Sequence, residues 1–180
     1  MGGVAVGHAV TERPELFGGA IMRVGILDAI RFIEATSNGP NHELEMGSLN
    51  GAAGVCQLLA MSTYHHIRDG ERYPSLLLTA GVNDNRVAPW LTTKAAARFA
   101  AASRSGKPVL LRLEGQGGHG VSTTTEQRHA ELADRLSFVL WQSRRSWLSA
   151  PNAVDGEGKL LAKTGPARRC AIGLGRIALR

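Results

Sequence analysis

The stretch SLLLTAGVNDNRVAPW, residues 75–90, decides the fold, together with KPVLLRLEGQGGHG at residues 107–120. Each stretch contains a short apolar run, at residues 75–80 and 108–114, which we expect to form a buried strand. The segment between the two runs has a helical composition. Short apolar runs joined by a helix are typical of parallel strands connected by a crossover helix. The sequence therefore predicts an α/β fold with a mostly parallel sheet flanked by helices.

A side chain with catalytic chemistry follows each predicted strand. Asp84 lies in the loop after the first strand, and His119 lies in the Gly-rich loop after the second. In open α/β sheets, ligands bind in loops just beyond the carboxyl ends of the strands. A carboxylate there accepts one imidazole N–H and leaves the other ring nitrogen free as a base. We expect the two side chains to meet; the alternative is that Asp84 opens a turn and His119 is an exposed loop histidine.

A hydrolase that uses such a pair also needs a nucleophilic serine, which in α/β-hydrolases lies within the pattern G-x-S-x-G. No serine of this chain has that pattern; the candidates that fail are Ser37, Ser48, Ser62 and Ser122. The chain opens with MGGVAVGHAVTERPELF, which indicates a Gly-rich turn that enters a helix. We expect residue 1 to fall one position after the missing nucleophile.

The rest of the sequence predicts the helices, the loop and the further strand that surround the two strands. Asp28 is a good N-cap for a helix, and residues 36–54 are rich in Gly, Asn, Ser and Pro, which predicts a loop that could line a cleft. The last predicted helix carries an apolar stripe formed by Leu132, Leu136, Val139 and Leu140, and we expect this stripe to cover the sheet after the last strand. The predicted elements are helices over residues 4–13, 28–35, 55–64, 89–103 and 122–141, and a strand over residues 20–27.

The charge of the chain is unevenly distributed. The formal net charge is +6, yet residues 1–143 contain 13 basic and 13 acidic side chains, whereas residues 144–180 contain 8 and 2. A basic face on the folded part, as expected of a nucleic-acid binder, is therefore not predicted. We interpret residues 1–143 as the domain and residues 144–180 as a disordered or artefactual extension; a basic tail for anionic partners is the alternative.

Several other classes of site and targeting signal are not indicated. Cys56 and Cys170 have no metal-ligand spacing, and His42, Glu43 and Glu45 lack the HExxH pattern, so neither a metal nor a cofactor is predicted. No apolar run is long enough for a membrane helix, and no signal peptide is visible. A cytoplasmic location is the expectation for the chain as given, although a longer parent could be exported.

Four blocks of the sequence together resemble the C-terminal part of the prolyl oligopeptidase family of serine peptidases, over residues 2–142. The blocks are GGVAVGHAVTERPELFGG from residue 2, MSTYHHIRDGERYPSLLLTAGVNDNRVAPW from residue 61, GKPVLLRLEGQGGHG from residue 106 and ELADRLSFVLW from residue 131. The resemblance implies a partial α/β-hydrolase fold that belongs to a catalytic domain. It also implies that a β-propeller and the nucleophile segment are supplied by an N-terminal part that this sequence lacks.

The resemblance assigns roles to five residues. It implies that Asp84 is the acid and His119 the base of a Ser-Asp-His triad that hydrolyses short peptides. Arg86 would bind a backbone carbonyl of the peptide, for which a rigid and permanently charged guanidinium is well suited. Gly2 and Gly3 would be the remnant of the nucleophile turn.

Two departures from the family pattern limit what carries over. The chain lacks the serine, so we expect it to be inactive alone, and a non-catalytic module that binds peptides or proteins is the alternative. The family's substrate-stacking tryptophan is also missing from the matching stretch HELEMG, residues 42–47. Specificity for proline is therefore not predicted.

Overall fold

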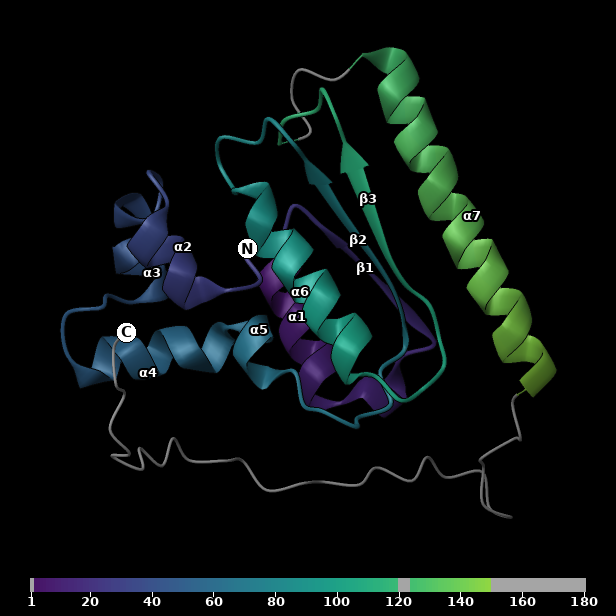
Figure 1. Ribbon diagram of the computed structural model, residues 1–180, viewed down its shortest axis with the longest axis horizontal. Coiled ribbons are helices and arrows are strands. Elements are labelled where there is room, and N and C mark those ends of the chain that lie inside the picture. The colour runs from purple at the N-terminus through teal and green to yellow at the C-terminus, as the bar shows by residue number, and fades with distance from the viewer. Residues whose placement is uncertain (1, 120–123, 150–180) are drawn as a thin grey trace. The chain divides into compact units, whose positions relative to one another are not determined.

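The structure, a computed structural model, describes residues 2–119 and 124–149, with side chains described as far as residue 143. Helical segments precede, separate and follow its strands along the chain (Figure 1). In order they are α1 (Gly2–Glu12), η1 (Pro14–Leu16), β1 (Gly19–Arg23), α2 (Ala29–Ala35), η2 (Pro40–His42), α3 (Glu43–Met46), α4 (Ala52–Met61), α5 (Thr63–His66), β2 (Ser75–Gly81), α6 (Pro89–Ala102), β3 (Val109–Glu114) and α7 (Thr125–Ser149).

The described strands form one parallel sheet in the order β1-β2-β3. Ile21 of β1 is paired with Leu77 of β2, and Leu78 of β2 with Leu111 of β3. Helices α1 and α6 cover one face of this sheet, and α7 lies on the other face (Figure 1). The predicted α/β architecture with a parallel sheet flanked by helices is confirmed.

The middle strand, β2, is buried along its whole length because both of its faces are covered. Leu76 and Leu78 project into the core with Met22 of β1 and Phe99 of α6. Tyr73, just before β2, meets the ring of Phe99 edge to face, with centroids 5.0 Å apart. A buried apolar run on a parallel strand is what the sequence predicted for this segment.

A second apolar cluster packs α2 and α4 beside the sheet, with Phe32, Met46 and Leu58 fully buried in it. Asp28 caps α2 as predicted, because its carboxylate accepts a hydrogen bond from the backbone N–H of Arg31 at 3.0 Å. The predicted loop over residues 36–54 is partly wrong. It contains the short helices η2 and α3, and Met46 from this segment belongs to the core.

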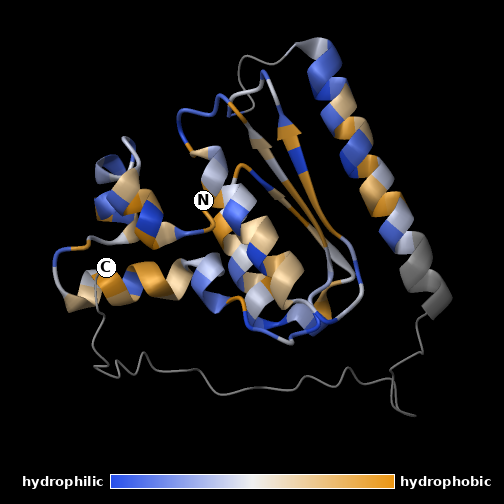
Figure 2. Ribbon diagram, viewed as in Figure 1, coloured by the Kyte–Doolittle hydropathy of each residue, from blue (hydrophilic) through white to orange (hydrophobic). Residues whose placement is uncertain are grey.

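The burial expected for β3 and α7 is also wrong in part. β3 is an edge strand, and it leaves Leu110, Leu111 and Leu113 from 40% to 47% exposed. α7 faces the sheet with Phe138 and Gln142, whereas the predicted stripe of Leu132, Leu136, Val139 and Leu140 lies on an exposed side. Apolar and polar segments alternate along α7 (Figure 2). The helix therefore has two faces with apolar residues, and the described chain covers one of them.

α7 ends at Ser149, past the domain boundary predicted at residue 143. The extension predicted over residues 144–180 lies mostly outside the described residues, as do Cys170 and Ser122. In the part of the chain that is described, no helix is both long and apolar enough to span a membrane.

Candidate active site

The loops after β2 and β3 begin side by side, because Gly81 and Glu114 are paired at the ends of these strands. Beyond that point the loops are joined by backbone hydrogen bonds, from Val82 N to Glu114 O at 2.9 Å and from Asn83 N to Gly117 O at 3.1 Å. The approach is so close that a Cβ on Gly81 would lie 2.3 Å from the Gly117 oxygen. A glycine is required there, and its presence lets the two loops meet.

The side chains of Asp84 and His119 form a hydrogen bond between these loops. His119 Nδ1 lies 2.8 Å from Asp84 Oδ2. The carboxylate side chain is 1% exposed and the imidazole 26%. Since an ionised carboxylate only accepts hydrogen bonds, Nδ1 carries the hydrogen in this pair. That leaves His119 Nε2 as the ring nitrogen available to a reacting group.

The second oxygen of Asp84 is held by the backbone. Oδ1 accepts hydrogen bonds from Arg86 N at 2.8 Å and from Val87 N at 2.9 Å. A buried carboxylate needs such partners, because charge removed from water costs several kcal/mol when it is unpaired. Asp84 therefore has a fixed orientation, and through the hydrogen bond it fixes the tautomer of His119.

His119 and Arg86 line a hollow of about 300 Å³ at this edge of the sheet. Gly2 and Gly3, at the start of α1, line the same hollow. The structure thus brings together the five residues singled out in the sequence, with Asp84 just behind the imidazole. None of the described residues that line the hollow carries a hydroxyl or thiol group.

The start of α1 is positioned by close backbone packing. A Cβ on Gly3 would lie 2.4 Å from Gly25 Cα, so only glycine lets the helix end approach the segment after β1. Val24, in that segment, has a φ of 42°, which is a left-handed conformation rarely adopted by β-branched residues. Its N–H donates to Thr79 O at 2.9 Å. Strained residues of this kind gather at functional sites, and Val24 lines the hollow.

Sequence reasoning missed the contribution of Asn38 and His42, which also line the hollow. Asn38 Nδ2 donates to the backbone oxygen of Arg86 at 3.2 Å. His42 Nδ1 lies 2.9 Å from the backbone oxygen of Asn38, and its ring packs edge to face against Phe32. The composition of residues 36–54 predicted a cleft-lining segment, but no local pattern indicated which of its side chains would turn inward.

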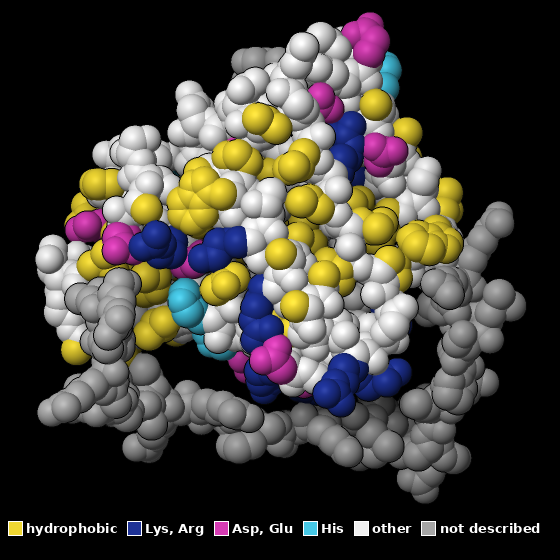
Figure 3. All heavy atoms as spheres, viewed as in Figure 1, with side chains coloured by type: hydrophobic (Ala, Val, Ile, Leu, Met, Phe, Trp, Pro, Cys, Tyr) yellow, Lys and Arg dark blue, Asp and Glu magenta, His cyan; other side chains and the backbone are white. Residues whose placement is uncertain are grey.

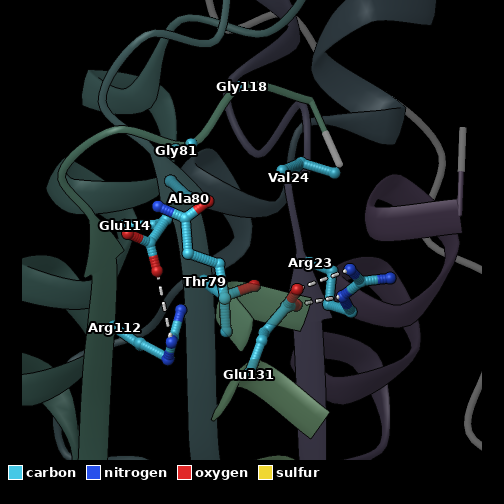
Figure 4. Close-up of a pocket in the computed structure, with 11 residues that line it drawn as sticks. Arg23, Val24, Thr79, Ala80, Gly81, Arg112, Glu114, Gly118 and Glu131 are labelled. Carbon is cyan, nitrogen blue, oxygen red and sulfur yellow. Dashed lines mark hydrogen bonds and ion pairs between the residues drawn. The ribbon is translucent and has the colours of Figure 1, made fainter. Parts of the chain in front are cut away.

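Two ion pairs border the site, one between β1 and α7 and one within β3 (Figure 4). Arg23 donates two hydrogen bonds to Glu131, at 2.6 and 3.0 Å, and Arg112 lies 3.3 Å from Glu114. Burial by itself raises the pKa of the Glu131 carboxyl, but the hydrogen bond from Arg23 and the nearby arginines outweigh burial and hold that pKa below its ordinary value. The charge of Arg23 is therefore balanced within the protein.

A metal centre is not formed by the described residues, where no three His, Cys, Asp or Glu side chains gather. His42, Glu43 and Glu45 remain neighbours in sequence without joining other ligands. The chemistry that the arrangement supports is proton transfer by an imidazole held by a buried carboxylate.

Comparison with known sequences identifies the relatives of the chain. The model of the prolyl oligopeptidase family matches residues 1–145. The prolyl endopeptidase of Elizabethkingia meningoseptica is 34% identical over 142 residues, which cover 78% of this chain and 20% of that protein. The prolyl endopeptidase of Dictyostelium discoideum is 28% identical over 140 residues, 76% of this chain and 18% of that protein. The chain spans about a fifth of the length of these relatives.

Solved structures give the same result for the fold. A prolyl endopeptidase structure matches with a TM-score of 0.59 and 34% identity, over 63% of this chain and 16% of that one. Oligopeptidase B from Leishmania major matches with a TM-score of 0.74 and 23% identity, over 78% of this chain and 20% of that one. On the family match and these likenesses, the chain belongs to the prolyl oligopeptidase family.

Proposed function

We propose that this chain is part of a serine-type peptidase that hydrolyses peptide bonds of short peptides. Asp84 and His119 are its triad acid and base, and Arg86 is a substrate-binding residue. The observation that carries the proposal is the 2.8 Å hydrogen bond between His119 Nδ1 and Asp84 Oδ2, which leaves Nε2 of His119 available to a reacting group. Membership of the peptidase family supports the same assignment.

In the proposed mechanism, His119 Nε2 takes the proton from a serine hydroxyl as its oxygen attacks the peptide carbonyl. The imidazolium then gives that proton to the leaving amine, and a water molecule repeats the sequence to release the acid. Asp84 holds the imidazole and stabilises its positive charge. Backbone N–H groups at the start of α1, near Gly2 and Gly3, stabilise the oxyanion, and Arg86 donates to a substrate carbonyl.

The nucleophile in this proposal is a serine contributed by sequence that this chain does not contain. The absence of a hydroxyl group among the described residues that line the hollow supports this step. We expect the 180-residue chain alone to show neither peptidase activity nor labelling by a fluorophosphonate probe. Labelling of the isolated chain would contradict the missing nucleophile and would locate the reactive side chain.

A chimera tests the roles of the acid and the base. Residues 2–142 would replace the matching segment of the Elizabethkingia meningoseptica prolyl endopeptidase, and hydrolysis of a chromogenic peptide would be followed. We expect an active chimera in which Asp84→Asn or His119→Gln lowers kcat by about 10⁴. His129→Gln, on the exposed side of α7, is the matched control and should retain activity. An active chimera that tolerates His119→Gln would overturn the assignment.

A non-catalytic module that binds peptides is the second candidate, and the lack of a hydroxyl group among the described residues that line the hollow favours it. The same chimera separates the two. If it folds and binds the peptide but neither labels with the probe nor cleaves the peptide, the binding module is the better description.

A further inference from the structure

The loop that carries His119 leaves the sheet at Glu114, the last residue of β3. The backbone oxygen of Glu114 accepts hydrogen bonds from Val82 N at 2.9 Å and from Gly117 N at 3.2 Å. This oxygen therefore joins the loop after β2, which contains Asp84, to the loop that contains His119. A displacement of Glu114 would move both loops and change the distance between the carboxylate and the imidazole.

Arg112 binds the side chain of Glu114 and helix α7 at the same time. Its Nη2 lies 3.3 Å from Glu114 Oε2 (Figure 4), and its Nε donates to Asp134 Oδ2 of α7 at 2.7 Å. α7 is the helix that follows the His119 loop along the chain. One guanidinium thus contacts both the strand residue where the loop begins and the helix to which the loop leads, as its fork of N–H donors allows.

The Arg112 side chain also borders a small cavity together with the backbone of the loop. The cavity has a volume of about 20 Å³, enough for one water molecule, and Arg112, Glu114, Gly117 and Gly118 are among the residues that line it (Figure 4). The Arg112 side chain is 19% exposed and that of Glu114 is 25% exposed, so water screens this pair less than a fully exposed one. Removal of the guanidinium would enlarge the cavity beside Gly117 and Gly118 and let the loop move.

We propose that Arg112 is a positioning residue, which fixes the His119 loop between β3 and α7 and so keeps the imidazole within hydrogen-bond distance of Asp84. This inference rests on the proposed peptidase function and adds to it a residue that acts through the loop. The alternative is that Arg112 only attaches α7 to the sheet. In that case its loss lowers stability and leaves catalysis by the folded protein unchanged.

Kinetics of the chimera test this role. We expect Arg112→Gln to lower kcat about tenfold and to leave KM within about twofold, because catalysis is sensitive to small errors in the placement of the base. Arg112→Lys keeps the charge but lacks the fork that reaches two carboxylates, so it should restore only part of the activity. Asp134→Asn removes the contact with α7, and combining it with Arg112→Gln should cost little more than Arg112→Gln alone.

Arg98→Gln is the matched control. Arg98 is on α6, on the other face of the sheet from α7 (Figure 1), and its side chain is 28% exposed. It pairs with Asp69 at 2.5 Å and donates to the backbone oxygen of Ile67 at 3.1 Å. We expect Arg98→Gln to lower the Tm of the chimera by an amount comparable to Arg112→Gln, and to leave kcat unchanged.

Hydrogen exchange of the same chimeras reports on the loop without any need for activity. The Asn83 N–H donates to Gly117 O, and the Gly117 N–H donates to Glu114 O. We expect Arg112→Gln to speed exchange of these two amides at least about tenfold, and Arg98→Gln to leave it unchanged. Mass spectrometry of peptides that cover residues 81–84 and 114–119 measures the rates.

The outcomes separate this inference from the function on which it rests. If Arg112→Gln lowers Tm but leaves kcat and loop exchange as in the unaltered chimera, Arg112 only attaches α7 and the inference is overturned. An active chimera that tolerates His119→Gln overturns the proposed function and this inference with it. If the chimera is inactive, the exchange rates decide: faster exchange with Arg112→Gln alone supports the role of Arg112, and unchanged exchange overturns it.

Discussion

Val24 adopts a backbone conformation that its β-branched side chain disfavours. Its φ of 42° is the only positive φ of a non-glycine residue in the described chain. We predict that Val24→Gly raises the free energy of unfolding by about 1 kcal/mol, because glycine adopts this conformation without strain. Urea unfolding of the chain at low concentration measures the change. A loss of stability would show that packing of the Val24 side chain outweighs its strain.

His65 makes stability depend on pH. Burial chiefly lowers its pKa, with a further lowering from Lys94 and His66, while Asp28 at 3.9 Å opposes the shift. A lowered pKa in the folded state means that the unfolded chain binds the proton more tightly. The stabilisation from neutral His65 is therefore present above the ordinary histidine pKa and is lost as the pH falls through and below it.

We predict that His65→Gln, made in the chimera, reduces the loss of Tm between pH 7 and pH 5. The comparison is with the unaltered chimera and with its His129→Gln variant, which removes an exposed histidine on α7. Equal pH dependence in all three proteins would contradict the assignment to His65.

At the scale of elements, the position of the His119 loop depends on the close packing where the loops after β2 and β3 begin. A Cβ at Gly81 would meet backbone oxygens of Gly117 and Gly118, which cannot move aside as a side chain does. We predict that Gly81→Ala costs about 2 kcal/mol of stability or more and displaces the His119 loop.

Gly115→Ala is the matched control for that change. It lies at the end of β3, and a Cβ there meets nothing within 4 Å. In the chimera, we expect Gly81→Ala to lower activity strongly and Gly115→Ala to leave it nearly unchanged. Similar effects of both would argue that the loop tolerates displacement.

The elements show what local sequence could and could not predict. The strand at β2 and the cap at Asp28 were predicted because apolar runs and capping oxygens act within a few residues. The ion pair of Asp28 with Lys94, at 2.6 Å, joins residues far apart in sequence and left no local pattern. The same holds for Asn38 and His42, whose positions depend on contacts with Arg86 and Phe32.

At the scale of the whole molecule, much apolar surface is uncovered. β3 exposes three leucines at an edge of the sheet, and α7 exposes a second apolar face. Figure 3 shows hydrophobic side chains spread over the face in view, including the side where α7 lies. The apolar pattern of this segment correctly predicted a helix. Which face of α7 packs against the sheet depends on neighbouring elements that the local sequence does not specify.

We predict that the 180-residue chain aggregates when it is expressed alone, because exposed apolar faces and free strand edges promote association. Leu136→Glu together with Leu140→Lys should reduce aggregation, since both leucines are more than half exposed. Size-exclusion chromatography with light scattering measures the effect. A monodisperse monomer of the unaltered chain with cooperative melting would refute this prediction.

The two oxygens of Asp84 serve different neighbours, and this divides the kinetic consequences of mutation. Oδ2 orients the imidazole, whereas Oδ1 fixes the backbone from which the Arg86 guanidinium extends. Under the proposed function, His119 variants should change kcat and Arg86 variants chiefly KM. Asp84 variants should change both parameters together, because a single anion sets both the reactive nitrogen and the placement of the substrate.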